Sequence, residues 1–241
     1  MGGSGEQFPE TVWASVLGQE GPPTPRSQAA FEELARLYWR PVYKYIRTAG
    51  GASIEDAKDL CQEFFGYLLE GRALAKYDRE RGRFRSYLKA VLANFLSASR
   101  RDAQRLKRGG GRVFVPLDVA ALETADFAGE RRTSTPDEIF DRQWVREILA
   151  EAVGELRRRL VAEGRELHAR VYELYHGLAP GAGDAPTYAS VAAAAGLEER
   201  QVKDHLGYAR GRLEKILRER LARRLPSERE ISAEINDALF G

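Results

Sequence analysis

Basic and aromatic side chains alternate between Lys76 and Arg108, and these residues have the clearest chemical character in the chain. Eleven lysines and arginines stand against three carboxylates here, a local charge of +8 in a chain whose formal net charge is +2. Such a cationic surface can hold the phosphates of a nucleic acid, and aromatic rings can stack on exposed bases. The stretch predicts a nucleic-acid interface, with a solvated basic helix as the simpler alternative.

A second set of candidate groups follows Thr187, where a short helix ends at Gly196 and a longer one covers residues 198–224. Small or apolar side chains stand where two such helices must approach, and Gly196 can turn the chain at a positive φ. This spacing is typical of a helix-turn-helix, although other helical hairpins share it. The outward positions carry groups that can contact base edges and phosphates: Arg200, Gln201, Lys203, Asp204, His205, Tyr208 and Arg212. Gly207 costs about 1 kcal/mol relative to alanine inside a helix, which suggests close approach of DNA or another helix.

A third set is acidic and lies on a helix that begins behind Ser53, with Asp56 as the second half of a capping box. One face of this helix is apolar. The other face carries Asp56, Asp59, Gln62 and Glu63. Carboxylates this close repel one another mildly, so the face serves either solubility or a basic partner.

The elements that position these groups all read as helices. We expect a helix over 27–48 that Pro41 kinks or splits, one from Phe84, one behind Thr135, and one over 167–175. The fold class is therefore all-α, with two small helical domains joined by an extended linker. The predicted parts are an N-terminal extension (1–26), a first domain (27–108), a linker (109–136) with a hinge at its three glycines, a second domain (137–225) and a helical tail (226–241). We expect the tail to fold back on its own domain, with a partner contact as the alternative.

Composition argues against several classes of function. The three histidines form no HExxH pair, Cys61 has no CxxC partner, and Gly109–Gly111 lacks the GKS ending of a phosphate loop. We therefore expect no metal, no cofactor and no enzymatic activity. A single cysteine permits no internal disulfide and fits a reducing cytosol. No apolar run is long enough for a membrane span, and we expect no secretory signal.

Two stretches resemble bacterial RNA polymerase sigma factors. The likeness to region 2 lies in three segments taken together, FEELARLYWRPVYKYIRTAG, SIEDAKDLCQEFFGYLLE and YDRERGRFRSYLKAVLANFLSASRR. The likeness to region 4 lies in TYASVAAAAGLEERQVKDHLGYARGRLEKIL. With only these two regions, the chain resembles the extracytoplasmic-function (group 4) class. The segments RGRFRSYL, KRGGG, VPLD and TPDEIF, with the C-terminal helix, resemble a longer-tailed subgroup. The likeness covers residues 28–225. It departs at Cys61, where the family often has threonine, and we expect a small buried side chain there.

The resemblance implies a role for each set of residues. The acidic face (Asp56, Asp59, Gln62 and Glu63) would dock on the β′ clamp of the polymerase core, which also includes β. The basic loop and the helix after it would capture the −10 element as the duplex opens. The residues assigned to this role are Lys76, Tyr77, Arg79, Arg81, Arg83, Arg85, Tyr87, Lys89 and Asn94. Phe84 faces the core by periodicity.

The second domain would then bind the −35 element of promoter DNA. Its base-reading residues would be Gln201, Asp204, His205 and Tyr208, and its phosphate contacts Arg200, Lys203, Arg210 and Arg212. The linker would pass through the polymerase. A cytoplasmic, nucleoid-associated location follows, with no membrane partner and with an anti-sigma factor or a regulatory kinase as candidate regulators. The alternative is a helix-turn-helix regulator that acts without replacing the sigma subunit and binds duplex DNA alone.

Overall fold

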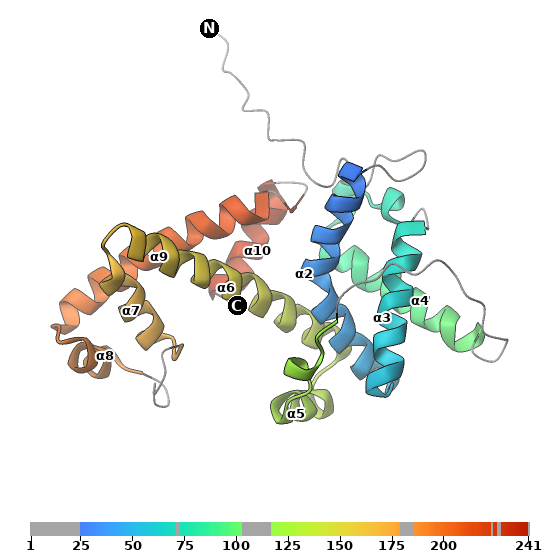
Figure 1. The fold of residues 1–241 in the computed structure, drawn as a ribbon, viewed down its shortest axis with the longest axis horizontal. Coiled ribbons are helices and arrows are strands. Elements are labelled where there is room, and N and C mark those ends of the chain that lie inside the picture. The colour runs from blue at the N-terminus through green and yellow to red at the C-terminus, as the bar shows by residue number, and fades with distance from the viewer. Residues whose placement is uncertain are drawn as a thin grey trace, which may run out of the picture. The chain divides into compact units, whose positions relative to one another are not determined.

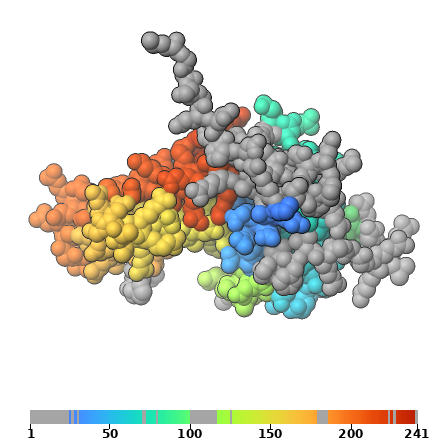
Figure 2. Space-filling model, turned by 45° about the horizontal axis from the view of Figure 1, so that its top comes forward, coloured from blue at the N-terminus to red at the C-terminus, as the bar shows by residue number. Residues whose placement is uncertain are grey.

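The computed structural model describes residues 25–70, 73–102, 117–178, 186–222, 224–225 and 228–240, which are coloured in Figure 1. The same scale of colour in Figure 2 shows which of these residues contribute to one face of the surface. The described residues form helices α2 to α10 and three short 3-10 turns, without a strand, so the all-α expectation is confirmed. No helix among them combines the length and apolar character that a membrane span needs. The predicted N-terminal extension up to Thr24 and the Gly109–Gly111 hinge lie outside the described residues.

The chain divides into two compact units. The first comprises residues 1–147 and 222–237, and the second comprises residues 148–221 and 238–241. One boundary of this division falls inside α6 (Pro136–Ala162), whose first three turns belong to the first unit.

Three long helices and an aromatic core build most of the first unit. They are α2 (Pro25–Gly50), α3 (Ile54–Glu70) and α4 (Phe84–Asp102). The predicted split at Pro41 does not occur, because α2 continues through this residue. The Ser53 hydroxyl accepts a hydrogen bond from the Asp56 amide at 3.1 Å, which confirms the predicted start of α3. Tyr38 is fully buried, and its ring centre lies 5.6 Å from that of Phe84 and 6.4 Å from that of Trp144.

The described part of the predicted linker is not extended. It contains the 3-10 turn η3 (Ala120–Leu122) and α5 (Ala125–Thr133), and the side chains of Leu122 and Phe127 are buried in the first unit. Between them, Glu123 accepts hydrogen bonds from the Tyr43 hydroxyl at 2.6 Å and from Nε of Arg47 at 2.7 Å. Apolar burial and a buried ion pair thus fix a segment whose sequence shows no sustained period.

The second unit contains the predicted helix-turn-helix. Its helices after α6 are α7 (Glu166–Tyr175), α8 (Tyr188–Ala195) and α9 (Glu199–Ala222). The Thr187 hydroxyl accepts a hydrogen bond from the Ser190 amide at 3.1 Å and caps α8, and Gly196 follows α8 with a φ of 67°. Val191 and Val202 are buried, as their apolar positions in the sequence predict.

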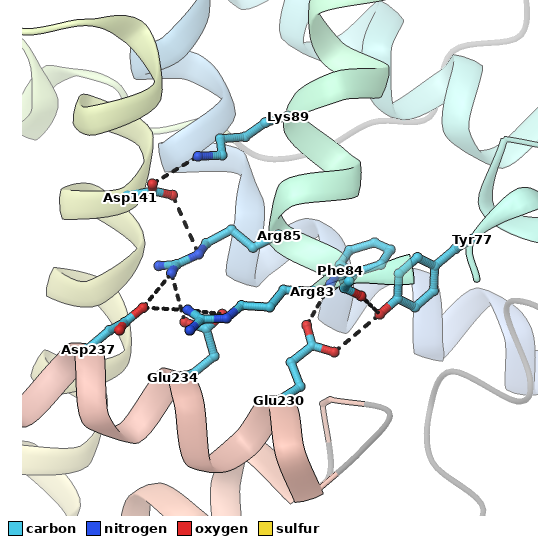
Figure 3. Close-up of polar contacts among 10 residues, drawn as sticks. Tyr77, Arg83, Phe84, Arg85, Lys89, Asp141, Glu230, Glu234 and Asp237 are labelled. Carbon is cyan, nitrogen blue, oxygen red and sulfur yellow. Dashed lines mark hydrogen bonds and ion pairs between the residues drawn. The ribbon is translucent and has the colours of Figure 1, made fainter. Parts of the chain in front are cut away.

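The C-terminal helix α10 (Glu228–Phe240) belongs to the first unit as far as Asp237. The prediction that the tail folds back on the second domain is therefore wrong. Ile231 and Ile235 are its buried apolar side chains among the described residues, and Glu230 and Glu234 are buried beside them. At the start of α4, Glu234 pairs with Arg85 and Glu230 accepts a hydrogen bond from the backbone N–H of Phe84, so both carboxylates link α10 to α4 (Figure 3).

Candidate nucleic-acid interface

The loop before α4 has a fixed shape. It contains two 3-10 turns, η1 (Leu74–Lys76) and η2 (Arg79–Arg81), and the carboxylate of Asp78 caps η2 by accepting a hydrogen bond from the Glu80 amide at 2.9 Å. Gly82 has a φ of 144°, a conformation that side chains disfavour. Its carbonyl accepts a hydrogen bond from the Tyr77 hydroxyl at 2.9 Å, which holds the loop against the first turn of α4.

The arginines at the start of α4 are bound by carboxylates of α10. Nη1 of Arg83 lies 2.5 Å from Oδ2 of Asp237. Nη2 of Arg85 lies 2.9 Å from the same oxygen and 3.1 Å from Oε2 of Glu234 (Figure 3). Arg85 is only 6% exposed, and its guanidinium carbon stands 4.8 Å from the centre of the Trp144 ring. The prediction of an outward, phosphate-holding Arg85 does not describe this structure, in which its side chain is buried.

Glu230 occupies the amino end of α4. Its carboxylate accepts a hydrogen bond from the backbone N–H of Phe84 at 2.7 Å and another from the Tyr77 hydroxyl at 3.2 Å. The first N–H groups of a helix have no partner within the helix and attract anions. Glu230 therefore caps α4 from a distant part of the chain. Burial raises the pKa of this carboxyl above its usual range.

Glu234 is the most deeply buried carboxyl of this cluster. Its side chain is 0% exposed, and neither oxygen has a hydrogen-bond partner, although Arg85 and Arg83 lie at ion-pair distances of 3.1 and 3.8 Å. Burial raises the pKa of Glu234 to about 7, against the opposing effect of the two arginines. The carboxylate is thus poorly solvated and only partly compensated.

Lys89, one turn further along α4, is held by a different helix. Its Nζ lies 2.8 Å from Asp141 and 3.2 Å from Asp137, both in the first turns of α6 (Figure 3 draws the first of these contacts). A cavity of about 290 Å³ opens beside this pair, lined also by Tyr45 and Ser86. Three of the cations that the sequence assigned to phosphates, Arg83, Arg85 and Lys89, are therefore paired with carboxylates from two helices.

The remaining predicted residues of this interface fall into different environments. Lys76, Arg81 and Asn94 are exposed, and Arg81 pairs with Asp78 at 3.1 Å. Arg79 belongs to η2, but its side chain lies outside the described set.

The two tyrosines and Phe84 form one aromatic group. The ring centre of Tyr77 is 5.2 Å from that of Phe84 and 5.4 Å from that of Tyr87. Tyr87 is half-buried and donates a hydrogen bond to the Ala73 carbonyl. Phe84 is fully buried, as its periodicity predicts. The tyrosines thus support the loop from within the unit.

The acidic face of α3 is open to solvent. Asp56, Asp59 and Glu63 are exposed, and Gln62 beside them is half-buried. Tyr67, one turn beyond Glu63, has an exposed fraction of 45%, which is large for an aromatic side chain. Carboxylates beside an exposed ring are the composition of a surface that can meet a basic protein. The geometry agrees with the sequence here.

Part of α9 presents polar groups to solvent as predicted. The exposed residues are Arg200, Gln201, Lys203, Asp204 and Arg210. Gln201 also has a structural role, because its side-chain oxygen accepts a hydrogen bond from the Glu198 amide at 2.9 Å. Lys203 lies over the Tyr188 ring of α8, with Nζ 5.3 Å from its centre.

Three other predicted contacts on α9 turn toward neighbouring elements. Nδ1 of His205 lies 2.9 Å from Nδ1 of His168 on α7. The Tyr208 ring packs on the same histidine with ring centres 4.3 Å apart, and Arg212 pairs with Glu163. Burial lowers the pKa of His168 below its usual range. His205, Tyr208 and Arg212 thus join α9 to the turn before α7 and to α7 itself, rather than facing outward.

Packing within the second unit does not explain why position 207 is a glycine. No heavy atom lies within 4 Å of the position that a Cβ would take, so no neighbouring helix of the described chain requires the glycine. The other half of the prediction, close approach of DNA, stays a prediction.

The sequence reasoning missed Glu230, Glu234 and Asp237. Their spacing of four and then three residues places them on one face of a helix, which is the signal that was available. Cys61 is fully buried, as expected of a small apolar side chain. Among the described residues, no group of three or more histidines, cysteines or carboxylates could hold a metal ion.

Comparison with known proteins adds no information about this site. Neither the family models, nor the curated proteins, nor the solved structures gave a match to this chain.

Proposed function

We propose that this chain is an RNA polymerase sigma factor of the extracytoplasmic-function type. The observation that carries the proposal is the exposed carboxylate face of α3 in the same compact unit as the basic loop and α4. A protein that only binds DNA gains nothing from an acidic face beside a basic one, whereas a protein that must bind both a basic enzyme surface and DNA needs both.

In this proposal the first unit docks through Asp56, Asp59 and Glu63 on the basic surface of the polymerase β′ clamp. The loop and α4 then hold the −10 strand as the duplex opens. Opening costs about 1–2 kcal/mol per base-pair step, which stacking on aromatic rings and ion pairing with phosphates can offset. Among the described side chains of this loop, the exposed cations are Lys76 and Arg81.

The second unit contacts the −35 element through the amino-terminal turns of α9. Arg200, Lys203 and Arg210 are exposed and suit phosphates, and Gln201 and Asp204 suit base edges. The −35 contacts are assigned to this exposed subset because His205 and Tyr208 are engaged with α7.

The test is a charge reversal confined to α3. Asp56→Lys, Asp59→Lys and Glu63→Lys together should abolish binding to core polymerase and transcription from any promoter in a start-site map. A matched control reverses Glu32, Asp118 and Asp126, which are exposed carboxylates of the same unit outside α3. The control should bind core polymerase normally. Unchanged binding by the α3 variant, with its helical content intact, refutes the docking face.

The exposed polar half of α9 also suits a regulator that binds duplex DNA without replacing the sigma subunit. This second candidate predicts tight, sequence-specific binding of promoter duplex by the isolated chain, and insensitivity to the α3 reversal. A sigma factor predicts weak duplex binding until core polymerase is added. One titration with and without core enzyme separates the two.

A further inference from the structure

The start of α4 has the features of an anion-binding site. Its first backbone N–H groups point out of the helix end, and Arg83 and Arg85 flank them. Tyr77 adds a hydroxyl donor 3.2 Å from the anion that sits there now. Helix ends with flanking arginines and hydroxyl donors suit phosphate groups, because all three supply donors to one oxyanion.

Three carboxylates of α10 occupy this site in the structure, and Asp141 of α6 also lies 3.4 Å from Nε of Arg85. Glu230 takes the Phe84 N–H at 2.7 Å, Asp237 takes both arginines at 2.5 and 2.9 Å, and Glu234 lies between them (Figure 3). The three acids come from one face of one helix, four and three residues apart. Their oxygens therefore stand in a row, as the phosphates of a strand do.

The contact is a poor choice for a purely structural helix. The buried face of α10 contains two isoleucines and two carboxyls, and one of these, Glu234, is 0% exposed without a hydrogen-bond partner. Burying charged groups costs solvation that ion pairing barely recovers, and apolar side chains in the same places usually stabilise more. Because α10 is held by charged groups at these positions, another anion can replace its carboxylates more easily than it could displace an apolar contact.

We infer that α10 is an intramolecular competitor for nucleic-acid phosphates, which closes the start of α4 until a single strand displaces it. The inference rests on the proposed function in one respect, that this face of α4 meets DNA. Beyond that function, it states that α10 occupies the start of α4 in the free protein and that α10 must leave before a strand can bind there. Apparent affinity for a strand is then reduced by the fraction of molecules in which α10 is docked.

Substitutions at Asp237 test the competition in the full-length chain. Its side chain is 36% exposed, so Asp237→Asn and Asp237→Lys should fold, and they remove or reverse its two ion pairs. The probe is a short, fluorescent, single-stranded DNA of mixed sequence, without polymerase. We expect Asp237→Asn to bind it about tenfold more tightly than the parent chain, as when the open population rises from a tenth to nearly all. Asp237→Lys should exceed this.

Asn236→Lys is the matched control. Asn236 is the exposed neighbour of Asp237 on the same helix, and this change adds the same unit of positive charge as Asp237→Asn. It should leave affinity near that of the parent. The salt dependence should also separate the variants, because each phosphate newly contacted steepens log K against log salt by about 0.7. Equal affinity and equal slope for Asp237→Asn and the parent overturn the inference.

Hydrogen exchange gives a second, direct readout. Binding of the single strand should protect amides at the start of α4 and deprotect those of α10 in the parent chain. An α10 that stays protected while the strand binds α4 overturns the inference, as does absence of binding in parent and variants alike. The proposed function is judged separately by core-polymerase binding and transcript starts. If the chain initiates transcription but α10 does not compete with the strand, the proposed function stands and this inference is refuted. If α10 competes with the strand but the chain neither binds core polymerase nor initiates transcription, this inference stands and the proposed function is refuted.

Discussion

Glu234 and Glu230, two buried carboxyls whose pKa values are both raised by burial, should contribute to the pH dependence of the first unit, and Glu234→Gln isolates the share of Glu234. Burial raises the pKa of this carboxyl from its ordinary 4.5 to about 7. Between these values the folded protein holds a proton that the unfolded chain has released. Stability from this group is therefore fully present below pH 4.5 and is lost as pH rises through 7. The difference between the two pKa values corresponds to about 3 kcal/mol.

Glutamine keeps the shape of the protonated side chain and cannot ionise. We therefore expect Glu234→Gln to match the parent in stability near pH 4 and to exceed it by up to about 3 kcal/mol at pH 8. The gain is an upper bound, because the ionised carboxylate also attracts Arg85 at 3.1 Å and the amide attracts it less. The same substitution should hold α10 more firmly and weaken single-strand binding at pH 8, opposite in sign to Asp237→Asn.

Denaturant unfolding followed by tryptophan fluorescence is the assay. Trp39 and Trp144 are both buried in the first unit, and the Trp144 ring lies 4.8 Å from the guanidinium of Arg85. Unfolding of this unit therefore changes the emission directly. Asn236→Lys serves again as the control, since an exposed substitution should change stability by less than about 0.5 kcal/mol. The reasoning is refuted if parent and Glu234→Gln lose the same stability between pH 5 and pH 8, or if the variant is the less stable at pH 8.

Three further substitutions test the packing and the turn. Phe127→Ala should cost about 3–5 kcal/mol in the same unfolding assay, because the ring is 1% exposed in the supposed linker; a loss below 1 kcal/mol would mean that this segment is not packed. Gly196→Ala should lower the melting temperature of the second unit by the equivalent of about 1–2 kcal/mol, since its φ is 67°. Gly207→Ala should stabilise α9 by about 1 kcal/mol, and simultaneous loss of duplex affinity would show that DNA approaches there.

Local signals predicted the helices well. The capping box at Thr187, the cap at Ser53 and the positive φ of Gly196 each depend on residues within four positions of one another, so the sequence contains the whole interaction. The apolar face of α4 was equally accessible, because the helical period alone places Phe84 inward. Short-range chemistry of this kind is legible without a structure.

Long-range packing was not legible in the same way. Proline disfavours the interior of a helix, so the sequence around Pro41 predicts a break. The helix α2 nevertheless continues through Pro41, and residues on both sides of it are buried in the core. The segment after residue 116 has no helical period, but Leu122 and Phe127 anchor it in a core formed by distant residues. His205 and Tyr208 read as outward groups because the sequence does not show that α7 lies beside them.

Charge counting shows the same limit most sharply. The +8 of residues 76–108 suggests a free basic surface, but Arg83, Arg85 and Lys89 are neutralised by Asp237, Glu234, Asp141 and Asp137 from two other helices. The net charge of one segment shows that it can attract anions. It does not show whether carboxylates from other parts of the same chain already pair with it. Under the inference above, a polynucleotide would compete with these groups, and the affinity of the basic face would depend on how firmly α10 is held. The acidic residues of α10 would then determine that affinity as much as the arginines do.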